Sequence, residues 1–206
     1  MLNVHARLHK DILWLVLDRH PLNNLTVEML EQLNKALRNA CKRSSTLQLI
    51  VITGTGEQAF CAGLDLLDDT EANRVALRQA VESVCGAFEE LRTLHIGTVA
   101  LVKGSAFGGG CELAALCDTI IAREDAQFRL PAANATVFPC ATAVALPSAL
   151  GKETVDRLVK SGATLTAREA MRMRLAHQVL STSRFLSDAE ELLVMLASVA
   201  ASARSR

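Results

Sequence analysis

Apolar and polar positions alternate with a period of two at the start of the chain. Every second side chain is apolar over residues 3–9, and residues 11–18 form a second, more continuous apolar run. The polar residues between the two runs indicate a β-hairpin. After Thr26, which is suited to capping a helix N-terminus, the period becomes helical, with apolar side chains at Met29, Leu30, Leu33, Leu37 and Cys41.

Short apolar, β-branched runs then alternate with helical patterns. Buried strands are predicted at residues 47–53, 98–102 and 119–123, with a short strand at 177–180. Helices are predicted at 71–94, 111–116, 140–150, 152–161, 166–175 and 187–203. This order predicts an α/β fold with largely parallel strands. Because no linker rich in Pro, Ser or Gly divides the chain, we expect one domain over residues 1–185 and a short helical tail over 186–206.

The composition excludes several classes of protein. Of the 206 residues, 50% are hydrophobic and only 21% charged, which is typical of a folded domain rather than a disordered chain. Lys plus Arg and Asp plus Glu both number 22, so the net charge is zero. With few aromatic residues and no basic surplus, a nucleic-acid partner is not expected. No apolar run reaches the roughly 20 residues that a membrane helix needs, so we expect no membrane partner.

The cysteines and histidines show no spacing typical of a metal or redox site. The six cysteines form no Cys-x-x-Cys pair, and the five histidines lie at no ligand spacing. No signal peptide is recognisable at the start of the sequence. We therefore expect six buried free thiols, no metal site and a cytoplasmic protein.

Gly54 to Ala59 formally matches the dinucleotide-binding pattern G-x-G-x-x-G/A after a strand. That pattern requires a helix to begin at once and an acidic residue about 20 positions on, at the end of the next strand. An irregular stretch follows here instead, so nicotinamide binding is not expected. The sequence also lacks a phosphate-binding G-x-x-x-x-G-K-[ST] and the G-x-S-x-G of serine hydrolases.

Two other glycine-bearing turns, at residues 59–66 and 104–113, carry candidate chemistry. The glycines of the second turn, 108–110, open a helix, whose free N–H groups favour an oxyanion. Glu112 follows within an apolar helix, where burial raises the pKa of a carboxyl and suits it to general acid or base work. The alternative is a tight packing turn, with Glu112 as a surface residue that satisfies the helix dipole.

Together these segments resemble the enoyl-CoA hydratase/isomerase (crotonase) superfamily. The resemblance rests on AFCAGLDL at residues 59–66 and GSAFGGGCELAALCD at 104–118, supported by HPLNNL at 20–25 and AQFRLP at 126–131. It implies a crotonase-like spiral of ββα units over residues 1–185, with the family's helical lid largely absent from 186–206. It also implies a coenzyme A thioester as substrate, no permanently bound cofactor, and a homotrimer or hexamer.

The resemblance further implies a set of site residues. The backbone N–H groups of Leu64 and Gly109 would form an oxyanion hole for the thioester carbonyl, and Glu112 would transfer the proton as the catalytic acid/base. The path of the coenzyme A moiety would be lined by Ala62, Leu64, Asp65 and Leu66. We expect the acyl pocket itself to be lined by the helix at 71–94 and by the C-terminal segment.

Position 132 departs from the family pattern. Hydration in this family uses two carboxylates around one water, and the second belongs directly after Pro131, where this chain has Ala132. A water molecule or Asn134 would have to compensate. One carboxylate suffices for double-bond isomerisation, since it can remove a proton and return it elsewhere.

Three functions therefore stay open at this point. The first is an active lyase or isomerase of the enoyl-CoA hydratase/isomerase type that uses Glu112. The second is a cyclic dienoyl-CoA hydratase of aromatic degradation, which the segment at 137–143 resembles. The third is a non-catalytic acyl-CoA-binding or assembly protein that lacks the second catalytic carboxylate.

Overall fold

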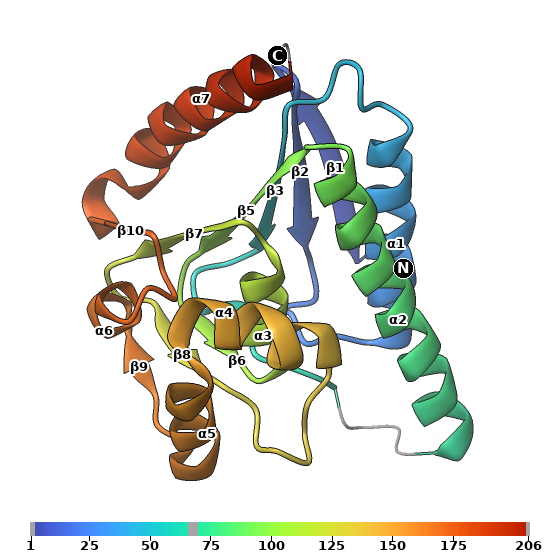
Figure 1. Cartoon of the computed structure of the whole chain (residues 1–206), viewed down its shortest axis with the longest axis vertical. Coiled ribbons are helices and arrows are strands. Elements are labelled where there is room, and N and C mark those ends of the chain that lie inside the picture. Colours follow the sequence, from blue (N-terminus) through green and yellow to red (C-terminus); the bar gives the residue numbers. More distant parts are fainter. Residues whose placement is uncertain (1–2, 66–69, 205–206) are drawn as a thin grey trace.

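The computed structural model describes residues 3–65 and 70–204, which form two sheets surrounded by helices (Figure 1). The large sheet has the strand order β1-β2-β3-β5-β7-β10, and the small sheet has the order β4-β6-β8-β9. Among the described strand pairs, β1–β2 and β8–β9 are antiparallel and the others are parallel. The strands are β1 (Val4–His9), β2 (Ile12–Leu17), β3 (Leu49–Gly54), β4 (Ala59–Cys61), β5 (Gly97–Val102), β6 (Ser105–Phe107), β7 (Thr119–Arg123), β8 (Gln127–Arg129), β9 (Leu165–Thr166) and β10 (Gln178–Leu180).

The chain winds as a spiral of ββα units, as the resemblance implies. In each of the pairs β3–β4, β5–β6 and β7–β8, the first strand joins the large sheet and the second joins the small sheet. Both sheets therefore add their strands in the same order along the chain. The helices are α1 (Val27–Cys41), α2 (Glu71–Thr93), α3 (Gly109–Leu116), α4 (Leu146–Leu150), α5 (Lys152–Ser161), α6 (Ala167–Arg172) and α7 (Phe185–Arg204), with a π-helix at Ala141–Ala145 and a 3-10 helix at Thr182–Arg184.

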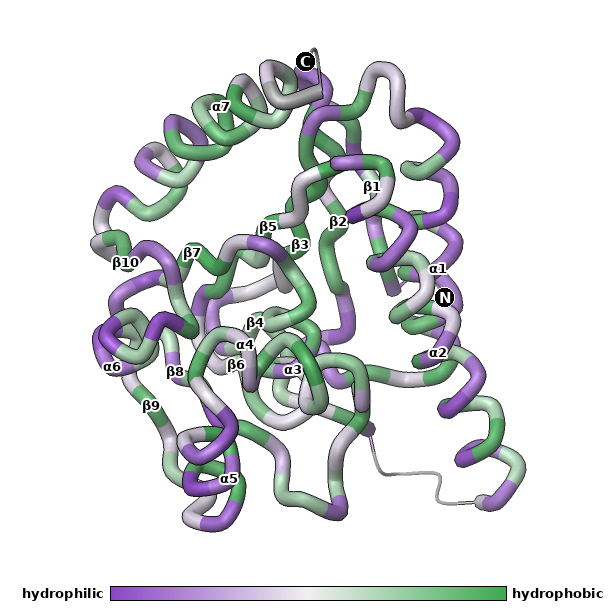
Figure 2. Tube along the Cα trace, in the orientation of Figure 1, coloured by the Kyte–Doolittle hydropathy of each residue, from purple (hydrophilic) through white to green (hydrophobic). Residues whose placement is uncertain are grey.

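The central strands of the large sheet are apolar on both faces. In β3, Ile50 and Ile52 belong to the main core with α1 and α2, whereas Leu49 and Val51 pack with α7. Alternate side chains of a strand point to opposite faces, so a run without polar residues requires cover on both sides. Figure 2 shows the central strands as continuous hydrophobic segments and the helices as mixed.

Most of the predicted local signals are confirmed. Lys10 and Asp11 both have positive φ in the β1–β2 hairpin, and the hydroxyl of Thr26 accepts a hydrogen bond from the N–H of Met29. In the small sheet, β4 and β6 lie within the two glycine-bearing turns, and the sequence pattern predicted none of its four strands. A π-helix occupies part of the helix predicted at 140–150.

The expectation of six free thiols is wrong for one pair. Cys85 on α2 and Cys140, 55 positions later in the sequence, form a disulfide with their Cα atoms 6.6 Å apart. Cys41, Cys61, Cys111 and Cys117 are free and buried. The pairing depends on how α2 lies against the segment before the π-helix. Because that is a tertiary contact, cysteine spacing carried no signal for it.

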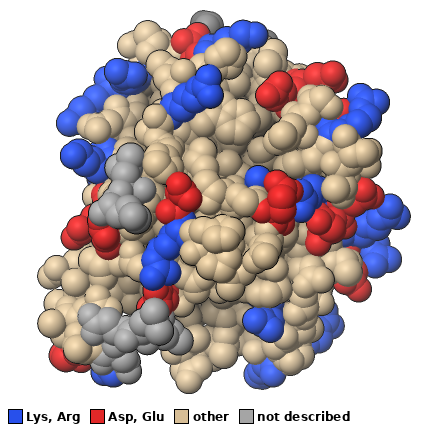
Figure 3. Space-filling view, turned by 180° about the vertical axis from the view of Figure 1, so that it is seen from behind, with Lys and Arg blue, Asp and Glu red and all other residues tan. Residues whose placement is uncertain are grey.

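The C-terminal helix does not line the acyl pocket as expected. Phe185, Ala189 and Leu193 of α7 pack on the face of the large sheet opposite α1 and α2. The described helices include none that combines the length and apolar character needed to cross a membrane. Acidic and basic side chains are intermixed over the face of the molecule drawn in Figure 3, in keeping with the zero net charge. The division at residues 185 and 186 stays a prediction.

Candidate active site

The two glycine-bearing turns meet because the small sheet places their strands side by side. β4 and β6 are parallel neighbours, so the turns that follow them leave the sheet at the same edge. A Cβ added at Gly63 would lie 3.1 Å from the carbonyl oxygen of Phe107 and 3.7 Å from the amide nitrogen of Gly109. The turns are thus in direct backbone contact, and the φ of +105° at Gly63 favours glycine there.

The start of α3 is packed too closely for larger residues. A Cβ at Gly110 would overlap the carbonyl oxygen of Cys61 at the end of β4, and one at Gly109 would lie 2.8 Å from Cγ2 of Val137. Gly109 and Gly110 are therefore required for close packing, as the alternative of a tight packing turn predicts. The same contacts fix the N-terminus of α3 against the end of β4.

Two peptide N–H groups at this junction are left unpaired. The N–H of Leu25 donates to Gly63 (2.8 Å) and the carbonyl of Leu25 accepts from Asp65 (2.9 Å), so the N–H of Leu64 points away from Leu25. Gly109 is the first residue of α3, where an N–H has no partner within the helix. Neither amide has a hydrogen-bond partner among residues 3–65 and 70–204.

Leu64 and Gly109 both line a cleft of about 800 Å³. One wall is formed by the two turns, one by α2, and one by the segment after β8 that carries Ala132. The structure thus brings together two predicted oxyanion residues, the predicted helix 71–94 and the altered position. The lining of this cleft includes Ala62, Leu64, Leu77, Arg78, Val81, Glu82, Gly109, Arg129, Ala132, Asn134, Val137 and Pro139.

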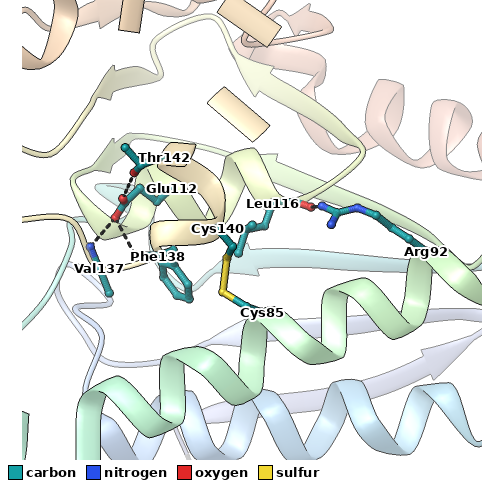
Figure 4. Close-up of a disulfide and its surroundings, with 8 residues drawn as sticks. All are labelled: Cys85, Arg92, Glu112, Leu116, Val137, Phe138, Cys140 and Thr142. Atoms are coloured by element: carbon teal, nitrogen blue, oxygen red, sulfur yellow. Dashed lines mark hydrogen bonds between the residues drawn. A yellow bond between two sulfur atoms is a disulfide. The ribbon is translucent and has the colours of Figure 1, made fainter. Parts of the chain in front are cut away.

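Glu112 lies behind the wall of the cleft and is completely buried. Its carboxylate accepts hydrogen bonds from the N–H groups of Val137 (2.8 Å) and Phe138 (3.2 Å) and from the hydroxyl of Thr142 (Figure 4). Burial raises its pKa, and these three hydrogen bonds oppose the rise. The idea of a surface residue is therefore wrong, while the expected rise in pKa agrees with the burial. Glu112 anchors the segment 137–142.

The predicted coenzyme A residues have different surroundings. Ala62 and Leu64 line the cleft, whereas the carboxylate of Asp65 forms an ion pair with Arg19. Leu66 lies outside the described residues. Exposed arginines at the cleft include Arg78 on α2 and Arg129, whose guanidinium lies 4.5 Å from the centre of the Phe107 ring. No cluster of three or more potential metal ligands occurs in the described part of the chain.

Asn23 supports the site, a role that sequence reasoning missed. It is completely buried, and its side-chain amide donates to the carbonyls of Thr55 (3.0 Å) and Ala59 (2.9 Å) and accepts from the N–H of Arg19 (3.1 Å). These bonds hold the turn before Leu25 against the start of β4. The asparagine in the HPLNNL segment was the available signal, but its role depends on contacts more than 30 residues away.

Comparisons with known proteins agree with this geometry. The family model for enoyl-CoA hydratase/isomerase matches residues 8–205. Carnitinyl-CoA dehydratase of Proteus mirabilis is 30% identical over 199 residues, 96% of this chain and 76% of that protein. The putative enoyl-CoA hydratase/isomerase YngF of Bacillus subtilis is 33% identical over 82% of this chain and 65% of its own length.

Solved structures show the same likeness. DspI of Pseudomonas aeruginosa superposes with a TM-score of 0.83 at 27% identity, over 98% of this chain and 75% of that one. An enoyl-CoA hydratase from Bacillus anthracis gives 0.83 at 28% identity, over 96% and 77%. With matching motifs, fold and family model, the chain belongs to the enoyl-CoA hydratase/isomerase family of the crotonase superfamily.

Proposed function

We propose that the protein binds an acyl-CoA thioester in the cleft and stabilises its enolate with the N–H groups of Leu64 and Gly109. The observation that carries this proposal is the pair of unpartnered amides on one cleft, held by backbone contacts. Donors fixed in advance stabilise developing negative charge without reorganising during the reaction. The coenzyme A moiety would follow Ala62, Leu64, Asp65 and Leu66, and the exposed Arg78 and Arg129 suit an anionic ligand.

Glu112 is proposed as the group that moves a proton at the α-carbon of the substrate. Its raised pKa suits this work, and its carboxylate is bonded to Val137, the residue that packs against Gly109. For Glu112 to reach a substrate, the segment 137–142 must move away from the carboxylate. A single carboxylate is enough for double-bond isomerisation. The oligomeric state, the cytoplasmic location and the cyclic dienoyl-CoA substrate stay predictions.

The test is exchange of the α-protons of butanoyl-CoA in D₂O, followed by mass. In the Glu112→Gln variant the amide oxygen can still accept from Val137 and Phe138, so the fold should be preserved. We expect exchange to fall about 100-fold or more, with affinity for butanoyl-CoA retained. Glu89→Gln, an exposed position on α2 outside the cleft, is the matched control and should exchange like the wild type. Full exchange in the Glu112→Gln variant contradicts the assigned role.

A second candidate is an acyl-CoA-binding protein without catalytic activity. The burial of Glu112 behind Val137 and Phe138, together with alanine at position 132, favours this alternative. It predicts binding of acyl-CoA thioesters with neither exchange nor turnover across enoyl, dienoyl and hydroxyacyl substrates. Any robust activity that depends on Glu112 removes it.

A further inference from the structure

We infer that Glu82 on α2 is a second acid/base residue of the cleft and supplies the carboxylate that position 132 lacks. This inference rests on the proposed function, and it adds hydration to the reactions that Glu112 alone could support. Glu112 supplies one carboxylate, and Ala132 cannot transfer a proton. Among the described residues that line the cleft, Glu82 is the only one with a carboxylate.

Glu82 belongs to a row of residues on one side of α2 that faces the cleft. Leu77, Arg78, Val81 and Glu82 line the cleft, a spacing that places them on one side of the helix. Cys85 is three residues further on, so it lies on the same side as Glu82. Its disulfide to Cys140 ties α2 to the residue next to the cleft-lining Pro139 (Figure 4). The tether therefore holds the helix at Glu82 against the wall that carries Ala132.

The carboxylate of Glu82 is free to meet a ligand. It is exposed, and it forms no hydrogen bond or ion pair with any described residue. Other glutamates of α2 are engaged, since Glu71 pairs with Arg78 (3.5 Å) and Glu90 pairs with Arg38. An unpaired carboxylate in a cleft can accept a proton from water without first breaking a salt bridge.

In the proposed hydration, the oxygen of a water molecule forms a bond to the β-carbon of an enoyl thioester while Glu82 takes one proton of that water. The electron pair of the carbon–carbon double bond moves towards the thioester carbonyl as an enolate, which the N–H groups of Leu64 and Gly109 stabilise. Once the segment 137–142 has moved away from it, protonated Glu112 delivers its proton to the α-carbon. The proton held by Glu82 returns to Glu112 through solvent, so one water is added and the enzyme is restored.

The experiment measures hydration of but-2-enoyl-CoA and α-proton exchange of butanoyl-CoA on the wild type and on Glu82→Gln, with Glu89→Gln as control. We expect Glu82→Gln to lower kcat for hydration about 100-fold or more, with KM little changed. It should also remove one limb of the pH profile of kcat/KM. Exchange should be retained, because it needs only Glu112.

The outcomes separate this inference from the proposed function. A wild type that exchanges α-protons but does not hydrate, or a Glu82→Gln variant that hydrates like Glu89→Gln, overturns the role of Glu82 alone. A wild type that neither exchanges nor hydrates overturns the proposed function. Equal loss of hydration and exchange in Glu82→Gln also overturns the inference, because that pattern indicates damage to the cleft as a whole.

Discussion

Glu112 on α3 and Glu82 on α2 are carboxylates beside the same cleft in opposite surroundings. Glu112 is completely buried and accepts three hydrogen bonds, and it does not reach the cleft surface. Glu82 is exposed on the cleft and has no polar partner among the described residues. Glu112 fixes the segment 137–142 through its hydrogen bonds, whereas Glu82 is held in place only by the helix that carries it.

This difference implies that substitutions at the two glutamates have different effects on the free energy of folding. Removing a buried acceptor leaves its donors without partners, which costs folding free energy. Removing an exposed, unpaired carboxylate leaves nothing unsatisfied. Variants at Glu112 and Glu82 can therefore separate a residue that stabilises the fold from one whose proposed role is confined to the reaction.

The largest expected effect comes from the disulfide that joins the walls. Cys85 and Cys140 are 55 residues apart, and by the chain-entropy relation a closed loop of this length contributes about 4 kcal/mol to the free energy of unfolding. We expect reduction by dithiothreitol to lower the unfolding free energy in urea by about that amount. Amide exchange at Val137 and Phe138 should become faster at the same time.

The paired variant Cys85→Ser with Cys140→Ser is the control for reduction. It should be destabilised to a similar degree and should show no further response to dithiothreitol. Coincident unfolding curves for the oxidised and reduced wild type would mean that the bond does not constrain the chain.

The next effect compares alanine at the two glutamates. Glu112→Ala leaves the N–H groups of Val137 and Phe138 unpaired in a buried site, so we expect a loss of about 2–3 kcal/mol in unfolding free energy. Glu82→Ala should stay within about 0.5 kcal/mol of the wild type. Urea unfolding of both variants measures the difference, and equal losses would break the comparison.

The smallest effect is the pH dependence of stability. Burial raises the pKa of Glu112 above its ordinary value of 4.5, so the folded chain holds this proton at pH values where the unfolded chain has lost it. The unfolding free energy therefore falls as pH rises from about 4.5 to the folded pKa. Glu112→Gln lacks this contribution, and its stability relative to the wild type should increase over that range. A pH-independent difference in urea unfolding contradicts the raised pKa.

Sequence patterns predicted the parts of the site that are set locally. Gly63 has a positive φ, and Gly110 lies against the backbone of Cys61, so both positions favour glycine. Requirements of this kind are visible in the sequence as glycine. The helix over residues 71–94 was predicted from its apolar period and forms a wall of the cleft. Glu82 lies on it, but a period read from apolar residues gives no weight to a polar residue on the same side.

The surroundings of Glu112 could not be predicted in the same way. Its donors, Val137 and Phe138, lie about 25 residues further along the chain, and the path of that segment depends on β8, α2 and the disulfide. The partner of Asp65, Arg19, is likewise distant in sequence. Contacts of this kind follow from tertiary packing, which neither periodicity nor motif spacing encodes.

Any side chain at Gly110 would overlap the backbone of Cys61, so this position cannot be substituted without moving the start of α3. The amides of Leu64 and Gly109 belong to the main chain, so no side-chain exchange short of proline deletes either donor. An exposed acidic group such as Glu82 can therefore be moved or removed without deleting the two amides of the proposed oxyanion hole. If the proposed roles hold, enzyme engineering can treat the main-chain amides as a constant half of the cleft and the exposed side chains of α2 as an exchangeable half.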